Sequence, residues 1–316
     1  MRLLIFATLF AIMLISNRNS VAEPPSGYDG MVRIADDTFL FVRDFKTPRS
    51  TEPRVGVLTV SADSGVQHEP IAVDDWKHDE GLPNDLESCC AIPGRPSEYL
   101  LSESGMYKGK FGRVFHVRLS KEKDGWKLIV LGVMKDLFKF LNDNDGSTYR
   151  GEQVEGTACI LNGDELILVF SKRGGQVKKE IRSARLFWGI LDLEIQKLTS
   201  LGNKQLVNQN LLGDRGCSDL LLVPGNGSFH VWSVATIDTG DLGPFRSVVY
   251  RAGALLPADN SKDITFARQS RPTIHADLQG LKVESLALPA RSAPRSVFSI
   301  GTDDEAYGGV WRPLFE

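Results

Sequence analysis

Hydrophobic residues recur along this chain in short alternating runs. The segment from 154 to 173 is representative: VEGTACIL is followed by the polar turn NGD and by a second run, ELILVF. An acidic residue leads a short strand, a turn follows, and a second strand rich in β-branched and aromatic residues returns. This pattern predicts a β-hairpin.

The same hairpin pattern occurs five times, at residues 28–44, 85–104, 154–173, 217–235 and 283–304. Intervals of 58, 68, 64 and 65 residues separate the acids that lead the copies, which are Asp29, Glu87, Glu155, Asp219 and Glu284. Self-similarity at a near-constant interval indicates a repeat architecture.

Each interval between hairpins has room for two further strands. The segments that favour strands are 54–62 and 69–76, 113–120 and 126–134, 184–194 and 204–211, and 245–255 and 263–270. Four strands per repeat, arranged radially, are typical of a β-propeller. We therefore expect an all-β propeller of five four-stranded blades, with six blades as the alternative. A β-sandwich is the rival architecture, but it does not require copies of one hairpin.

Two segments depart from the regular pattern. The last repeat has only residues 310–315 after its hairpin, so we expect residues 23–33 to supply its missing strand and close the ring. Apolar positions from 133 to 143 follow a period nearer 3.6 than 2, which predicts one short helix there.

The N-terminus resembles an export signal. A basic Arg2 precedes an apolar run from Leu3 to Ile15, and Ser20-Val21-Ala22 suits a signal-peptidase site. We expect residues 1–22 to be a signal peptide and 23–316 to be a single domain, secreted or periplasmic, without a membrane contact after cleavage. A retained N-terminal anchor is the alternative.

The composition of the chain indicates which kinds of binding partner to expect. The chain is 42% hydrophobic with a formal net charge of −3, and its basic residues are balanced by acidic ones. This balance argues against nucleic acid as a partner, and we expect a monomer whose partner is a small-molecule or ester substrate. Export would permit disulfides, but the four cysteines, Cys89, Cys90, Cys159 and Cys217, are better read as small packing residues.

The repeated acids are the strongest candidate site. The first strand of each propeller blade lines the central channel, so Glu87, Glu155, Glu284 and Asp219 should converge there. Carboxylates brought together raise one another's pKa unless a cation binds between them, and oxygen-only ligands suit calcium. The alternative is that each acid accepts backbone N–H bonds where its own strand begins.

Two other segments carry candidate binding residues. Arg173 ends a strand that leads from Glu155, within a basic segment (171–185) that suits either a phosphate group or a solvated hairpin tip. Asp303 and Asp304 follow the last hairpin between glycines, where they could serve a ligand at the channel mouth or form a polar turn. Signatures of serine hydrolases, zinc peptidases and P-loop proteins are absent from the sequence, and no catalytic residue is assigned.

The leading phrases DLESCCAIP, GEQVEGTACIL, RGCSDLLLV and KVESLALP resemble the D-[IL]-E-G-[LI]-A repeats of secreted bacterial β-propellers described as phytase-like or esterase-like. The similarity runs from about residue 28 to the C-terminus and is nearest to a group of that family without an established activity. It implies that Glu87, Glu155 and Glu284 bind calcium and that Arg173 binds substrate. Two functions follow as expectations: a calcium-dependent hydrolase of phosphate or related esters, or a non-catalytic propeller with a structural calcium ion.

Overall fold

The computed structural model describes residues 27–45, 53–61, 65–73, 75–76, 81–105, 112–135, 153–177, 180–237, 239–258 and 263–316. The expected signal peptide lies outside these residues. The described part of the chain is almost entirely β-structure, with two short 3-10 turns, η1 (Gln209–Leu211) and η2 (Glu305–Tyr307). It contains no helix that is long and apolar enough to cross a membrane.

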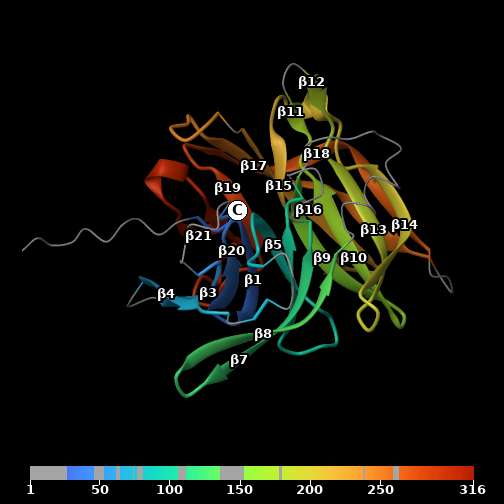
Figure 1. Cartoon of the computed structure of the whole chain (residues 1–316). Helices are drawn as coiled ribbons and strands as arrows, with labels where there is room; N and C mark the ends of the chain where they lie inside the picture. Colours follow the sequence, from blue (N-terminus) through green and yellow to red (C-terminus); the bar gives the residue numbers. More distant parts are fainter. Residues whose placement is uncertain are drawn as a thin grey trace, which may run out of the picture.

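The described strands form five antiparallel sheets of three or four strands, each of which is one blade of a propeller, and one smaller two-stranded sheet (Figure 1). Blade 1 contains β1 (Gly30–Ala35), β2 (Thr38–Val42), β3 (Val55–Ser61) and β4 (Gly65–Ile71), and blade 2 contains β5 (Leu86–Ala91), β6 (Glu98–Glu103), β7 (Val114–Glu122) and β8 (Gly125–Met134). Blade 3 contains β9 (Val154–Asn162), β10 (Glu165–Lys172), β13 (Arg185–Asp192) and β14 (Lys197–Gln205), and blade 4 contains β15 (Gly216–Gly225), β16 (Ser228–Ile237), β17 (Arg246–Pro257) and β18 (Ile264–Gln279). Blade 5 contains β19 (Val283–Ala287), β20 (Ser296–Thr302) and β21 (Trp311–Phe315). A separate hairpin, β11 (Gly175–Val177) and β12 (Glu180–Arg182), extends from blade 3.

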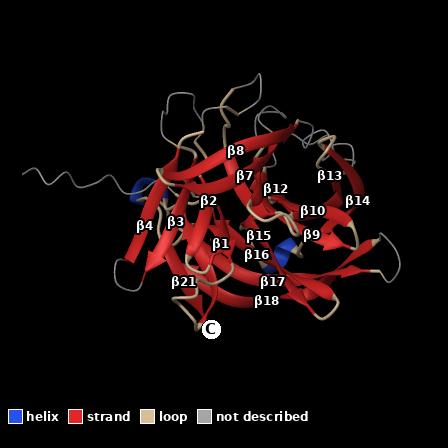
Figure 2. Cartoon of the chain, turned by 90° about the horizontal axis from the view of Figure 1, so that it is seen from below, coloured by secondary structure: helices blue, strands red, loops and turns tan. Residues whose placement is uncertain are grey.

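The inner strands close a ring. β1 contacts β5, β5 contacts β9, β9 contacts β15, β15 contacts β19, and β19 returns to β1. Figure 2 shows the sheets arranged around this centre, with β4 and β14 at the periphery. The predicted five-bladed propeller is therefore confirmed.

Apolar side chains fill each interface between neighbouring blades. One cluster of buried residues lies between blades 1 and 2, around Phe115, and another lies between blades 3 and 4, around Tyr250. Three more clusters fill the remaining interfaces. Inner and second strands such as β5, β6 and β19 are buried on both faces, because each sheet packs against a neighbouring blade on either side.

The inner strands approach one another very closely near their first residues. A Cβ atom at Gly156 would lie 2.4 Å from the backbone nitrogen of Leu220 on the next inner strand. A Cβ atom at Gly30 would lie 2.6 Å from the Cα atom of Ser88. Glycine is therefore needed at both positions for backbone contact between blades.

The ring closes in a different way from the one expected. Gly30 to Arg33 belong to the inner strand of blade 1, and blade 5 has three strands in the described part of the chain. The backbone N–H of Tyr28 donates to the carbonyl of Thr302 at 3.0 Å, and Arg33 Nη1 donates to the carbonyl of Pro289 at 2.6 Å. Side-chain and loop contacts thus join the last blade to the first, without a donated outer strand from residues 30–33.

Two local predictions also need correction. Val133 and Met134 end strand β8, since β-ladder pairing with β7 outweighs the helical spacing there; the rest of the expected helix, 136–143, lies outside the described residues. The outer strand of blade 3 is Lys197–Gln205, earlier than the predicted 204–211. Its side chains are half exposed, so it lacks the apolar signal used to find strands.

Candidate functional site

Four of the leading acids stand at the start of inner strands and are buried there: Asp29, Glu87, Glu155 and Glu284. In three blades a β-bulge sets the acid apart from the ladder. Leu86 pairs with Glu103 and Ser88 with Ser102, so Glu87 has no partner residue in the register. Glu155 and Glu284 are passed over in the same way. A bulge re-aims the extra residue's side chain, and here the same device recurs around the channel.

Asp219 occupies a different place. In blade 4 the residue that the ladder skips is Ser218, while Asp219 pairs with Val234. The Asp219 carboxylate accepts backbone N–H bonds from Leu220 at 2.7 Å and from Leu286 at 2.6 Å. It therefore fastens inner strand β15 to β19, as the strand-capping alternative describes.

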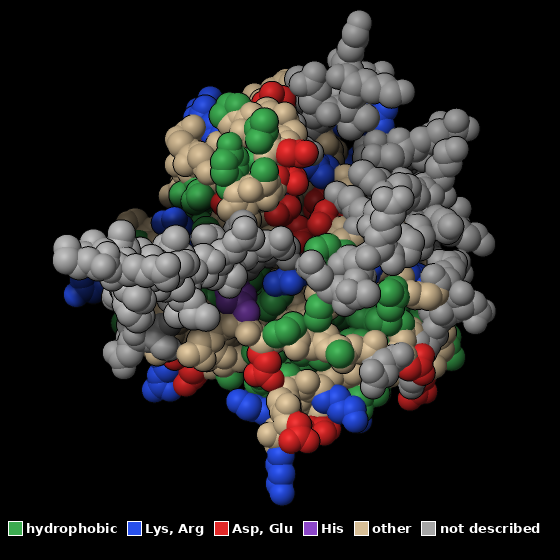
Figure 3. Space-filling model, turned by 60° about the vertical axis from the view of Figure 1, so that its left-hand side comes forward, with side chains coloured by type: hydrophobic (Ala, Val, Ile, Leu, Met, Phe, Trp, Pro, Cys, Tyr) green, Lys and Arg blue, Asp and Glu red, His purple; other side chains and the backbone are tan. Residues whose placement is uncertain are grey.

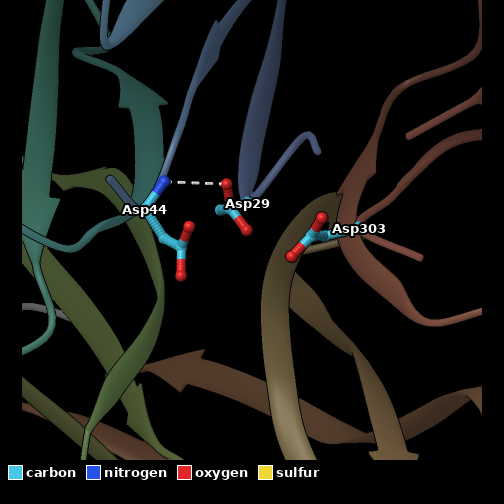
Figure 4. A group of neighbouring side chains, drawn as sticks. All are labelled: Asp29, Asp44 and Asp303. Carbon is cyan, nitrogen blue, oxygen red and sulfur yellow. Dashed lines mark hydrogen bonds between the residues drawn. The ribbon is translucent and has the colours of Figure 1, made fainter. Parts of the chain in front are cut away.

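Further aspartates lie near these four acids. Together, Asp29, Glu87, Glu155, Glu284, Asp44, Asp85 and Asp303 are called the acidic cluster. Asp44 follows β2, and Asp85 precedes β5 with a left-handed backbone at φ 65°. Oxygen atoms of Asp29, Asp44 and Asp303 all lie within 4.8 Å of one another, and so do those of Asp44, Asp85 and Glu87. Figure 4 shows the first group, in which three separate segments turn their carboxylates toward one space. Asp44 is common to both groups.

Two basic side chains lie against the cluster. Arg173 Nη1 is 3.3 Å from Glu155 Oε1 and donates to Gln153 Oε1 at 3.0 Å. Lys282 Nζ is 3.3 Å from Glu284 Oε1 and 3.7 Å from Asp303 Oδ2, and it also contacts Glu305. Burial alone would lower the pKa of Lys282, but Glu284 and Asp303 outweigh it and raise that pKa above its usual range.

The positive charges of Arg173 and Lys282 do not return the pKa values of the buried acids to their ordinary range. Burial, followed by repulsion from Asp44, raises the pKa of Asp29 well above its ordinary value. Burial and then Glu155 and Asp85 do the same for the pKa of Glu87. Burial raises the pKa of Glu284 to about 7 and that of Asp303 to about 7, although Lys282 opposes both shifts. Burial is the largest cause of each of these shifts, and a cation bound among the carboxylates would favour their ionised forms.

The three remaining residues that the sequence suggested for ligand binding are Arg173, Asp303 and Asp304. Arg173 lies against Glu155, and Asp303 belongs to one of the two groups of possible metal ligands. Asp304 accepts from the backbone N–H of Lys282 at 2.7 Å and from the Thr302 hydroxyl at 2.8 Å, so its carboxylate stabilises the turn beside the cluster.

Acidic side chains gather in a hollow on the face shown in Figure 3. The donor set consists of carboxylate oxygens from several blades, without sulfur or imidazole among the grouped ligands. Such a set fits a hard divalent cation and suits calcium better than a soft metal.

Comparison with solved structures shows which proteins have a similar fold. No family model and no curated protein sequence matches the chain. Among solved structures, it is similar to an exo-1,5-α-L-arabinanase from a bovine ruminal metagenomic library, with 12% identity, 93% of this chain and 94% of that chain covered, and a TM-score of 0.52. It is also similar to an α-L-arabinanase of Cellvibrio cellulosa solved with arabinohexaose, with 9% identity, 92% and 91% of the two chains covered, and a TM-score of 0.50. The chain is thus a five-bladed β-propeller whose fold is similar to that of arabinanase propellers.

Proposed function

We propose that this protein is a hydrolase of anionic esters that works with a calcium ion held by the channel carboxylates. One observation carries the proposal: buried acids from several blades converge, and two groups of three oxygen ligands meet at Asp44. The resemblance of the leading motifs to phytase-like propellers supports calcium and a phosphate ester.

The residues present fit a calcium ion. Asp29, Asp44 and Asp303 offer one set of ligands, and Asp44, Asp85 and Glu87 offer a second. Calcium accepts six to eight oxygen ligands in flexible geometry, so two partly overlapping carboxylate sets suit it. When bound, the ion would polarise an ester oxygen and lower the pKa of a water molecule.

The basic side chains bind and orient the substrate in this proposal. Arg173 is held by Gln153 and Glu155, and its side chain is 22% exposed, so the guanidinium is both positioned and reachable. Arginine recognises phosphate oxygens through fixed, paired donors. Lys282 is pinned among Glu284, Asp303 and Glu305 and keeps its proton. It therefore supplies fixed positive charge beside the ligands.

A second candidate function is glycoside hydrolysis. The specific observation is that Glu284, with a pKa of about 7, is suited to act as a general acid among other carboxylates. Glycosidases use two carboxyl groups in different protonation states, and both similar structures quoted above are named as arabinanases. A non-catalytic propeller with a structural ion is the remaining reading.

Turnover distinguishes these functions. The purified protein would be assayed on phosphate monoesters, carboxyl esters and arabino-oligosaccharides, each with added calcium and with a chelator. Calcium-dependent release of phosphate or alcohol, lost in Asp44→Asn and retained in the control Asp277→Asn, supports the proposal. Asp277 suits the control because it is an exposed acid on β18. Calcium-independent sugar release supports the glycosidase, and calcium binding without any turnover supports the structural ion.

A further inference from the structure

Two cysteines on neighbouring inner strands face each other outside the acidic cluster. The Sγ atoms of Cys90 and Cys159 are 3.6 Å apart, with the thiol of Cys90 donating toward that of Cys159. Cys90 lies on β5 of blade 2, and Cys159 lies on β9 of blade 3. The pair therefore spans a blade interface.

A polar pair two residues earlier holds these strands in register. The hydroxyls of Ser88 and Thr157 hydrogen-bond at 2.8 Å, and the backbone N–H of Thr157 donates to Ser88 Oγ at 2.7 Å. Side chains two positions apart lie on the same face of a strand. The contact that joins Ser88 to Thr157 thus also brings Cys90 opposite Cys159.

The other two cysteines have different surroundings. Cys89 points to the opposite face of β5, where its thiol donates to the carbonyl of Leu40 at 3.7 Å within the core between blades 1 and 2. Cys217 is buried against the hydroxyls of Ser171 and Ser233, at 3.3 and 3.2 Å. Neither thiol faces another cysteine in these contacts.

Cys90 and Cys159 also line a cavity between the inner strands. This cavity of about 270 Å³ is bordered by residues of all five inner strands, farther along β1, β5, β9 and β19 than their leading acids, and on β15 it includes Asp219 itself. Its wall is mainly apolar, with Met31, Leu221 and Leu288 among the lining residues. Cys159 is partly exposed and Cys90 is buried, so we expect a reagent to meet Cys159 first.

We propose that Cys90 and Cys159 form a reversible disulfide that links blade 2 to blade 3. A disulfide needs the sulfurs about 2.05 Å apart, so they must approach by about 1.5 Å from their reduced positions. Side-chain rotation into the adjoining cavity allows a movement of that size. This inference is independent of the proposed hydrolase activity.

The reaction balances as two thiol–disulfide exchanges with a low-molecular-weight disulfide. One cysteine loses its proton and attacks a sulfur of the reagent, which releases one reagent thiol and leaves a mixed disulfide. The second cysteine loses its proton and attacks the protein-side sulfur, which releases the other reagent thiol. Two protons and two electrons pass to the reagent. The hydrogen bond from Cys90 and burial raise the pKa of Cys159, so the first exchange should be slow at neutral pH.

The test incubates the whole purified protein with oxidised glutathione over a time course and then counts thiols after denaturation. The wild-type count should fall from four to two, with a mass loss of two hydrogen atoms and a cross-linked peptide containing Cys90 and Cys159. Cys89→Ser and Cys217→Ser should fall from three thiols to one. Cys90→Ser and Cys159→Ser should form no internal bridge.

A thermal melt of the wild type needs no variant. The oxidised protein should melt at a higher temperature than the reduced protein, because the bridge closes a 69-residue segment and restricts the unfolded chain. Four free thiols after prolonged oxidation would overturn the proposal. So would glutathione bound to both cysteines without a bridge, or a mapped Cys89–Cys90 bond.

Discussion

Arg173 Nη1 lies 3.3 Å from Oε1 of Glu155, and the Glu155 side chain is only 1% exposed. This contact partly compensates the charge of a carboxylate that is buried at the start of strand β9. Glu155 has a local cationic partner on β10's extension, in addition to any cation that the cluster binds. The ion pair is therefore part of the folded protein's stability as well as of its candidate site.

Removing the arginine should expose the cost of that burial. Arg173→Met leaves Glu155 without this partner, so we expect a loss of about 3 kcal/mol in the free energy of unfolding, measured by urea denaturation at pH 8. The double variant Arg173→Met/Glu155→Gln should recover part of the loss. As a control, Arg246→Met removes an exposed pair with Asp277 and should change little. If Arg173→Met and Arg246→Met lowered the free energy of unfolding equally, the buried pair would have no special role.

Asp44 should dominate cation binding because it belongs to both ligand groups. Asp44→Asn should weaken calcium binding at least about tenfold, or ~1.4 kcal/mol, as measured by calorimetry. Asp304→Asn should have a smaller effect, since Asp304 stabilises the adjacent turn. Unchanged calcium affinity in Asp44→Asn would contradict the ligand assignment.

Asp219 should behave as a structural residue. Asp219→Ala removes the acceptor for two backbone N–H groups, and an unsatisfied buried donor costs about 1–3 kcal/mol. We expect a lower melting temperature with calcium affinity close to the wild-type value. A variant that melts normally but loses calcium would place Asp219 in the cation site after all.

The metal-free protein should lose stability as the pH rises from about 4 to about 7. Glu284 and Asp303 have folded-state pKa values of about 7, above their unfolded values. The folded state therefore binds more protons in that window, and the free energy of unfolding falls with pH, by an amount on the order of a few kcal/mol. Unfolding curves at several pH values in a chelator would measure this slope.

Calcium should oppose the loss, because a bound cation favours the ionised carboxylates. The double variant Glu284→Gln/Asp303→Asn should flatten the profile. A metal-free protein whose stability rises between pH 4 and 7 would show that other groups outweigh these two.

Sequence patterns predicted the ring but only part of the site. The hairpin repeat, led by an acid in each copy, was sufficient for the five blades and for the places of Glu87, Glu155 and Glu284 at the start of inner strands. Of these three acids only Glu87 belongs to a group of possible metal ligands among the described residues, while Glu155 lies beside Arg173 and Glu284 beside Lys282. Asp44, Asp85 and Lys282 were missed because they lie just outside the inner strands and break no local pattern. Their places depend on how loops from different blades meet at the channel, which no single repeat encodes.

Blade 4 shows why one acid was placed in the wrong register. In the other copies an acid precedes a small residue, as in Glu87-Ser88 and Glu155-Gly156, whereas here Ser218 precedes Asp219. That reversed order was a readable signal. The bulge falls at Ser218, so the acid turns to the backbone of the neighbouring strand instead.

The close approach of Gly30 and Gly156 to the next inner strand has a consequence for the bore of the channel. Asp29, Glu87, Glu155 and Glu284 are each followed by glycine or serine, and at Gly30 and Gly156 the missing side chain lets the next inner strand come close. The radius of any ion that the ring admits is therefore limited by the spacer behind each carboxylate. A larger side chain at Gly30 or Gly156 should push that inner strand away from its neighbour, and so move the carboxylate beside it, without replacing a ligand.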